Sequence, residues 1–164
     1  MHGFQIWVNL PAKDKMMAPR YQDIMSEELP IAESEDKLVW AKVIAGKALG
    51  AEAVIDTVIP ITYIHMRLKP EAKYIHECEK EHNVMVYVFG GSVNIGGKTV
   101  SDGELGLSGK GDSIAFEAGH EGAEYLILGG PEIDEPIARY GPFVMNTREE
   151  IMQAITDFNN GTLA

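Results

Sequence analysis

The fold is decided by the stretch Gly141-Pro142-Phe143-Val144-Met145-Asn146, which is followed by Thr147-Arg148-Glu149-Glu150. Thr147 and Glu150 have the spacing of a capping box, in which each side chain bonds the other residue's backbone at a helix start. Apolar residues follow at the spacing of one helix face, and they are Ile151, Ala154, Ile155 and Phe158. Asn160-Gly161 favours the left-handed conformation that ends a helix. The sequence therefore predicts a β-domain that closes into an amphipathic helix over about residues 147–159.

The middle of the chain is a series of short β-prone runs that glycine and proline separate. The runs are residues 38–45, 53–59, 63–69, 84–89, 92–95, 104–107, 112–116 and 124–128. Short strands at regular spacing are typical of a sandwich or a barrel. Gly90-Gly91 and Gly96-Gly97 predict tight turns between strands, because glycine adopts positive φ without steric cost. We therefore expect an all-β domain of antiparallel sheets.

The N-terminal part predicts one strand and a surface arm. Apolar and polar residues alternate from Phe4 to Leu10, as in a half-buried strand, and Pro11 would stop the ladder. Residues 12–36 have no clean period, which predicts a surface connection with at most a turn of helix. A chain of 164 residues suits one domain. We divide it into a strand and arm over residues 1–36, a barrel over 37–130 and an extension over 131–164.

Composition excludes several classes of function. The formal net charge is −11 and the pI is about 4.8, so the phosphates of a nucleic acid would be repelled and direct binding is not expected. No apolar run reaches the roughly 18 residues of a membrane span. The single cysteine cannot form an internal disulfide, and the N-terminus lacks the pattern of a secretory signal. We expect a soluble, cytoplasmic protein without direct contact to membranes.

Separated strings along the chain resemble the C-terminal half of the pirins, a family of two-barrel proteins in the cupin superfamily. The strings are Trp7-Val8-Asn9-Leu10-Pro11, Val86-Tyr87-Val88-Phe89-Gly90-Gly91, residues 126–131 and residues 141–146. The resemblance implies a single, jelly-roll-like cupin barrel of two antiparallel sheets, with an N-terminal arm and a C-terminal helix. It also implies that the family's other barrel binds iron, with quercetin dioxygenase activity in some members and transcriptional co-regulation in others.

The cupin metal motif does not match this barrel. Counting back from residues 87–90 places the motif's glutamate near Val84 and its two histidines near Cys78 and Lys80. His120 falls ahead of the place where the second motif puts its histidine. An iron or zinc site needs several converging donor side chains, so these departures predict no metal, no other cofactor and no catalytic residues.

One segment keeps a metal-dependent alternative open. Residues 76–82 are dense in possible ligands, and His76, Glu79 and His82, with His120, would be the donors for iron or another divalent metal. The alternative is a solvated acidic loop between strands. Under the metal reading the chain would be a quercetinase-like dioxygenase. Cys78 does not suit a nucleophile, because its neighbours Glu77 and Glu79 act to raise the pKa of its thiol.

Other side chains are candidates for a pocket or an interface. Trp7 and Gln5 share the face of the predicted first strand that turns away from the core, and His65 shares a strand face with Arg67. Met16 and Met17 suggest an adaptable contact arm. We therefore predict a non-catalytic structural or interaction domain that forms a homodimer or packs on a partner cupin barrel. A third reading is a barrel that binds a small aromatic ligand.

Overall fold

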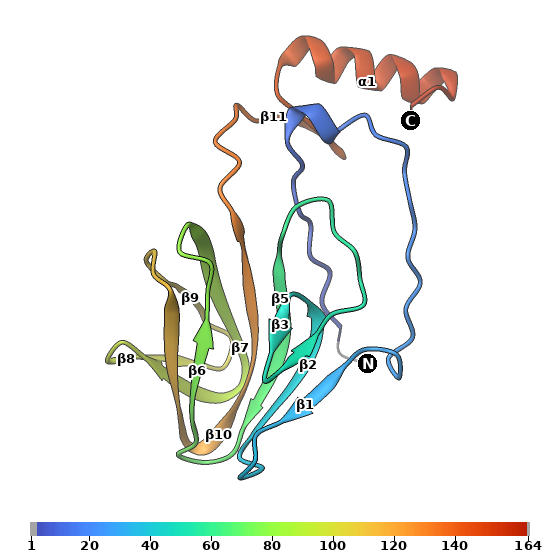
Figure 1. The fold of residues 1–164 in the computed structure, drawn as a ribbon. Coiled ribbons are helices and arrows are strands. Elements are labelled where there is room, and N and C mark those ends of the chain that lie inside the picture. Colours follow the sequence, from blue (N-terminus) through green and yellow to red (C-terminus); the bar gives the residue numbers. More distant parts are fainter. Residues whose placement is uncertain (1–2, 164) are drawn as a thin grey trace. The chain divides into compact units, whose positions relative to one another are not determined.

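The computed structural model describes residues 3–163, which fall into two compact units (Figure 1). Residues 22–132 form the larger unit, and residues 3–21 form the smaller one together with residues 133–163. Within the described residues, no helix combines the length and the apolar character needed to cross a membrane.

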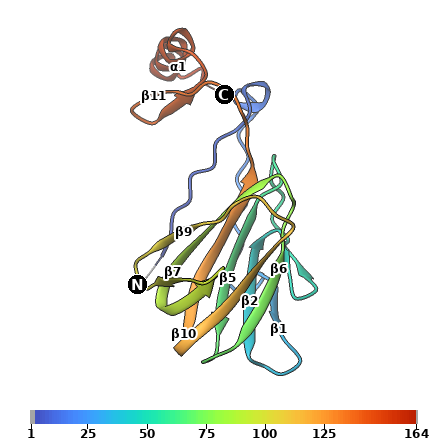
Figure 2. The same cartoon turned by 90° about the vertical axis from the view of Figure 1, so that its left-hand side faces the viewer.

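The larger unit is built on one continuous antiparallel sheet that curls into two layers. The strand order is β1-β2-β5-β10-β7-β8, with β6 paired to β10 and β9 paired to β7. β2 and β5 lie on one side and β6 and β8 on the other (Figure 1), and Figure 2 shows β2, β5, β10 and β7 side by side in that order. The strands are β1 (Ile31–Glu33), β2 (Val39–Ala45), β5 (Thr62–Leu68), β6 (Lys73–Glu77), β7 (His82–Ile95), β8 (Lys98–Ser101), β9 (Leu105–Leu107) and β10 (Ser113–Pro131). The predicted all-β fold with antiparallel pairing is confirmed.

The two longest strands belong to both layers. The first part of β10 pairs with β6, and its second part pairs with β5. The change of layer coincides with shifts in the register of β10 against β7, one of them between Ala118 and Ala123. Gly91 lies opposite this irregularity with φ +66°, and a Cβ built there would lie 2.1 Å from the carbonyl oxygen of Gly122. The close approach leaves no room for a side chain.

Several predicted strand boundaries were therefore wrong. Gly90-Gly91 is not a turn but the bent part of β7, and the runs predicted over 112–116 and 124–128 are one strand. Residues 53–59 form no strand, and a short hairpin of β3 (Lys47–Ala48) and β4 (Ala51–Glu52) precedes them. The turn at Gly96-Gly97 is confirmed, with φ of 58° and 80°.

The core lies between the two layers and follows the period of two. On β2, Val39, Ala41 and Val43 are buried and alternate with less buried residues. On β5, Ile64 and Met66 are fully buried, and His65 between them points to the opposite face. Each strand of this layer therefore has an inner apolar face and an outer, more polar face.

The smaller unit contains residues 141–150, which include the glycine turn and the start of the helix. β11 (Ala138–Tyr140) and β12 (Phe143–Met145) form a hairpin whose turn includes Gly141 at φ +55°. Helix α1 (Arg148–Asn160) follows, with Thr147 as its N-cap residue. Both hydrogen bonds of the capping box are present, and Gly161 ends the helix in the left-handed conformation. The predicted helix and its caps are confirmed.

The predicted first strand was wrong. Residues 3–10 have no strand partner, and Pro11 precedes a 3-10 turn, η1 (Ala12–Asp14). Side chains fix this segment instead of a ladder. The ammonium of Lys15 donates to Oδ1 of Asn9 at 2.6 Å and to the carbonyl oxygen of Val144 at 3.1 Å. The backbone amide of Ala12 donates to Oε2 of Glu135 at 2.7 Å, a contact that a period-two pattern cannot reveal.

Candidate functional site

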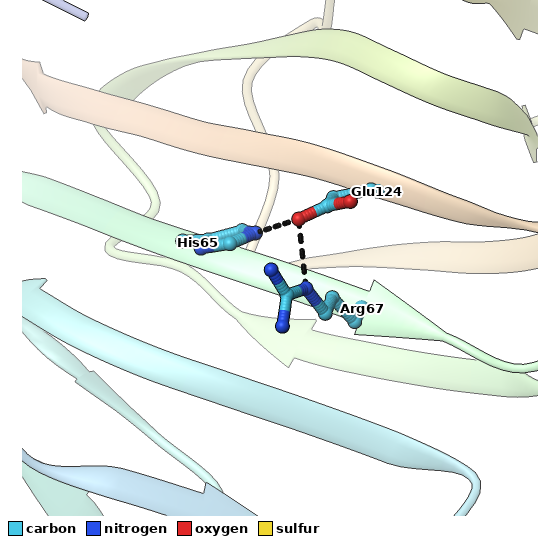
Figure 3. A network of polar contacts seen from close by, with 3 residues as sticks. All are labelled: His65, Arg67 and Glu124. Atoms are coloured by element: carbon cyan, nitrogen blue, oxygen red, sulfur yellow. Dashed lines mark hydrogen bonds and ion pairs between the residues drawn. The ribbon is translucent and has the colours of Figure 1, made fainter. Parts of the chain in front are cut away.

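A polar cluster lies on the outer face of the sheet formed by β5 and β10 (Figure 3). His65 and Arg67 share a face of β5, and the register places Glu124 of β10 opposite Arg67. One carboxylate oxygen of Glu124 accepts from Nε2 of His65 and from Nε of Arg67, each at 2.7 Å. These charge-assisted bonds fix all three side chains relative to the two strands.

Aromatic rings surround this cluster. The His65 ring meets Trp40 edge to face at a centroid distance of 5.1 Å and lies 5.4 Å from the ring of Phe89. The guanidinium carbon of Arg67 lies 4.9 Å from the centroid of the Trp40 ring, within the range of a cation–π interaction. We call these five residues, Trp40, His65, Arg67, Phe89 and Glu124, the outer-face cluster.

Burial and charge act in opposite directions on the ionisable groups of the cluster. Burial lowers the pKa of His65, and the hydrogen bond and charge of Glu124 only partly offset it. The neutral ring therefore donates its Nε2 proton to the carboxylate. Burial acts to raise the pKa of Glu124, but the hydrogen bonds from Arg67 and His65 and the charge of Arg67 outweigh it, so that the pKa is lowered. The arrangement stabilises a neutral histidine beside a charged carboxylate.

The cluster is neither core nor free surface. The side chains of His65, Glu124 and Arg67 are 19%, 33% and 57% exposed. Arginine and tryptophan in a half-buried setting are the residue types that dominate binding energy at protein interfaces. Chemically, the arrangement suits recognition of another surface.

The metal candidates are placed apart. His76 lies in β6 and is 4% exposed, with Nδ1 3.2 Å from the hydroxyl of Tyr74. The predicted loop over residues 76–82 was therefore partly wrong, because residues 73–77 are a strand. Glu79 lies in the turn after it, and its carbonyl oxygen accepts from the amide of His82, the first residue of β7. Cys78 is partly buried, which raises the pKa of its thiol.

His120 is an exposed surface residue. Its side chain is 98% exposed, and Nδ1 is 2.6 Å from a carboxylate oxygen of Glu71. Among residues 3–163, no group of three or more His, Cys, Asp and Glu side chains could hold a metal ion. The described residues therefore do not fit an iron centre within this barrel, and we derive no chemical step through a metal.

The remaining candidates lie in the smaller unit. Trp7 is 66% exposed and Gln5 is exposed, but Ile6 and Val8 are exposed as well. The expected alternation between a core face and a contact face is therefore absent here. Met16 and Met17 are 49% and 39% exposed, and their role in an interface remains a prediction.

Sequence reasoning missed most of the outer-face cluster. It paired His65 with Arg67 on one strand face, but it did not find Glu124, which lies 59 residues further along the chain than His65. Trp40 on β2 had a detectable signal, since it is a large aromatic residue between the buried Val39 and Ala41. The pairing of strands that are distant in the chain joins these residues, and a local sequence pattern does not show which distant strands pair.

Comparisons with known proteins agree with this architecture. A family model described as the Pirin C-terminal cupin domain matches residues 63–164. Pirin from Homo sapiens is 38% identical over 164 residues, which cover 97% of this chain and 56% of that protein. A pirin-like protein from Caulobacter vibrioides is 37% identical over 163 residues, which cover 98% and 58%.

A solved structure has a similar fold. A quercetin 2,3-dioxygenase from Acinetobacter baumannii matches with a TM-score of 0.87 at 33% identity, covering 96% of this chain and 55% of that one. The expected cupin fold is confirmed. The chain spans little more than half the length of the relatives that it matches.

Proposed function

The chain belongs to the pirin family and carries its C-terminal cupin domain, and we propose that this domain is a non-catalytic interaction module that docks on a second cupin barrel. The outer-face cluster carries the proposal. Its side chains are held in fixed positions by ion pairs and ring contacts, although none of them belongs to the buried core cluster. A pre-ordered surface loses little conformational entropy when it binds a partner.

The occupant that best suits this face is another barrel of the same kind. Relatives of this chain are nearly twice as long, so a barrel of this type has further protein beside it in those proteins. A second copy of this chain supplies a barrel of that kind. The face offers a cation, a carboxylate and aromatic rings, so that two copies related by a twofold axis can place Arg67 of each against Glu124 of the other.

The first test is the mass of the protein in solution. Light scattering across a concentration series should give twice the chain mass of 18.0 kDa at micromolar concentration, and Arg67→Glu should return the protein to monomer. Lys73→Glu is a matched control, because Lys73 forms an exposed ion pair with Glu117 on β6 and β10, outside the outer-face cluster. A monomer at all concentrations would contradict self-association.

A dioxygenase function is the rival, because several relatives of this chain are named quercetin 2,3-dioxygenases or putative ones. It would need donor side chains that residues 3–163 do not bring together. Metal analysis of protein purified without chelators separates the two readings. A stoichiometric metal that is lost in His76→Ala or His82→Ala would favour the enzyme, whereas a folded protein without metal would favour the interaction module.

A further inference from the structure

A second feature of the larger unit is a hollow of about 450 Å³ between the β3–β4 hairpin and strand β6. Its apolar lining includes Ala48, Leu49 and Ala51, which pack against the core. The exposed charged residues that line it are Lys47, Glu52 and Glu77. The volume lies within the range of about 300–1,000 Å³ that is usual for small-molecule sites.

Two polar side chains of β6 reach this lining from the barrel interior. Tyr74 and His76 both line the hollow, and the Tyr74 hydroxyl lies 3.2 Å from Nδ1 of His76. Burial lowers the pKa of His76 and raises the pKa of Tyr74 to about 12, so both groups are neutral at pH 7. When the tyrosine donates to Nδ1, the histidine keeps a proton on Nε2 and the phenol oxygen remains an acceptor.

A third polar group lies deeper in the same interior. Tyr125 is fully buried, and its hydroxyl has no hydrogen-bond partner in the part of the chain that the structure describes. Its ring stacks on Phe116 at 5.0 Å, and the ring of Tyr74 stacks on Phe116 at 6.2 Å. Tyr125 is not among the residues that line the hollow, so it belongs to the core behind Tyr74.

We propose that this hollow binds a small, uncharged molecule with an apolar body and a hydroxyl or carbonyl oxygen. The apolar lining takes the body, and the neutral Tyr74 and His76 side chains offer a donor and an acceptor for the oxygen. A charged group suits this end of the hollow less well, because two neutral side chains are poor substitutes for the water that an ion gives up. The site does not depend on the outer-face cluster, which lies on the opposite side of the sheet.

The experiment uses three ring compounds that differ in one substituent. 4-Ethylphenol carries a hydroxyl group, ethylbenzene has hydrogen in its place, and 4-ethylbenzoate carries a negative charge there. Titrations of the full chain at pH 7, followed by NMR and calorimetry, should show saturable binding of 4-ethylphenol. It should be about 2- to 12-fold tighter than that of ethylbenzene, which lacks the hydrogen bond, and tighter than that of 4-ethylbenzoate, which would bring a charge into the hollow.

Variants connect the binding to the Tyr74 hydroxyl. Tyr74→Phe removes one oxygen and keeps the ring, and the lost hydrogen bond should weaken 4-ethylphenol binding about 2- to 12-fold. Tyr140→Phe is the matched control, because Tyr140 is 69% exposed on β11. Weaker binding in Tyr74→Phe supports the site. Absent binding, equal binding of ethylbenzene, or unchanged affinity in Tyr74→Phe would overturn it.

Discussion

At the scale of single residues, Glu124 controls the state of its neighbours. Its carboxylate accepts from a guanidinium and from an imidazole at the same oxygen, and the Arg67 side chain also covers the Trp40 ring. Removing the negative charge would leave Arg67 and His65 facing each other without the group that holds them together. The positions of Arg67 and Trp40 on the outer face therefore depend on the charge of Glu124.

The first prediction concerns Glu124→Gln, which keeps the shape of the side chain and removes its charge. The pKa of His65 should fall further, because the hydrogen bond and charge of Glu124 act to raise it against burial. NMR titration of the histidine rings measures this directly. Glu117→Gln is the control, since Glu117 pairs with Lys73. An unchanged or raised pKa of His65 in Glu124→Gln would contradict the electrostatic account.

The second prediction is a loss of stability in mild acid. The pKa values of His65 and His76 are lowered in the folded protein, so the unfolded chain binds more protons once the pH falls below about 6.5. Stability is therefore highest above that pH and decreases as the pH falls from 7 towards 5. The charge of Glu77 acts to raise the pKa of His76 and reduces the effect without reversing it.

Urea unfolding at pH 8, 7, 6 and 5 tests this sign. The free energy of unfolding should be nearly constant from pH 8 to pH 7 and should then decrease. The decrease should be smaller in the double variant His65→Gln with His76→Gln. Equal slopes in the double variant and the original protein would show that other groups cause the acid sensitivity.

At the scale of elements, β6 shows why part of the site could not be predicted. Its inner face carries Tyr74 and His76, whereas Ile75 between them is 65% exposed. Hydrophobic periodicity predicts that the isoleucine faces the core and the histidine faces solvent. The structure shows the reverse for both side chains. The strand was missed because its polar residues face inward, and such inversions are typical of places where a polar interior serves a purpose.

The third prediction concerns the bend that takes β7 and β10 from one layer to the other. Gly91→Ala should destabilise the protein by about 3 kcal/mol or more, because positive φ and a backbone clash act together. Gly97→Ala is the control: its φ is +80°, but nothing lies within 4 Å of the added carbon. It should cost only about 1–2 kcal/mol. Equal costs by urea unfolding would mean that the close approach is not rigid.

The fourth prediction concerns the start of α1. Thr147→Ala removes the hydroxyl that accepts from the Glu150 amide and should cost about 0.5–2 kcal/mol. Thr156→Ala serves as the control in the same helix, because its hydroxyl only bonds back to the Met152 carbonyl and alanine has the higher helix propensity. It should be neutral or stabilising. Amide hydrogen exchange in the first helical turn should be faster in Thr147→Ala than in the original protein. That result would locate the effect at the start of the helix.

At the scale of the whole molecule, the features that the sequence predicts are those set by residues close to one another in the chain. The helix caps and the turn at Gly96-Gly97 depend on neighbours in the chain, and they were predicted correctly. The Gly90-Gly91 bend and the ion pair of His65 with Glu124 depend on register between distant strands, and both escaped prediction. The family resemblance supplied the barrel, but not the side chains that its outer face presents.

The fifth prediction locates the interface of the proposed dimer. A tryptophan at an interface contributes more than its area suggests, so Trp40→Ala should weaken self-association more than about tenfold. Ile75→Ala removes an apolar side chain of β6 that is 65% exposed, so it controls for general loss of apolar surface. Sedimentation equilibrium gives both dissociation constants. If Ile75→Ala weakens the dimer and Trp40→Ala does not, the contact surface is on the β6 side. The outer-face cluster then stabilises only the sheet and has no role in the dimer.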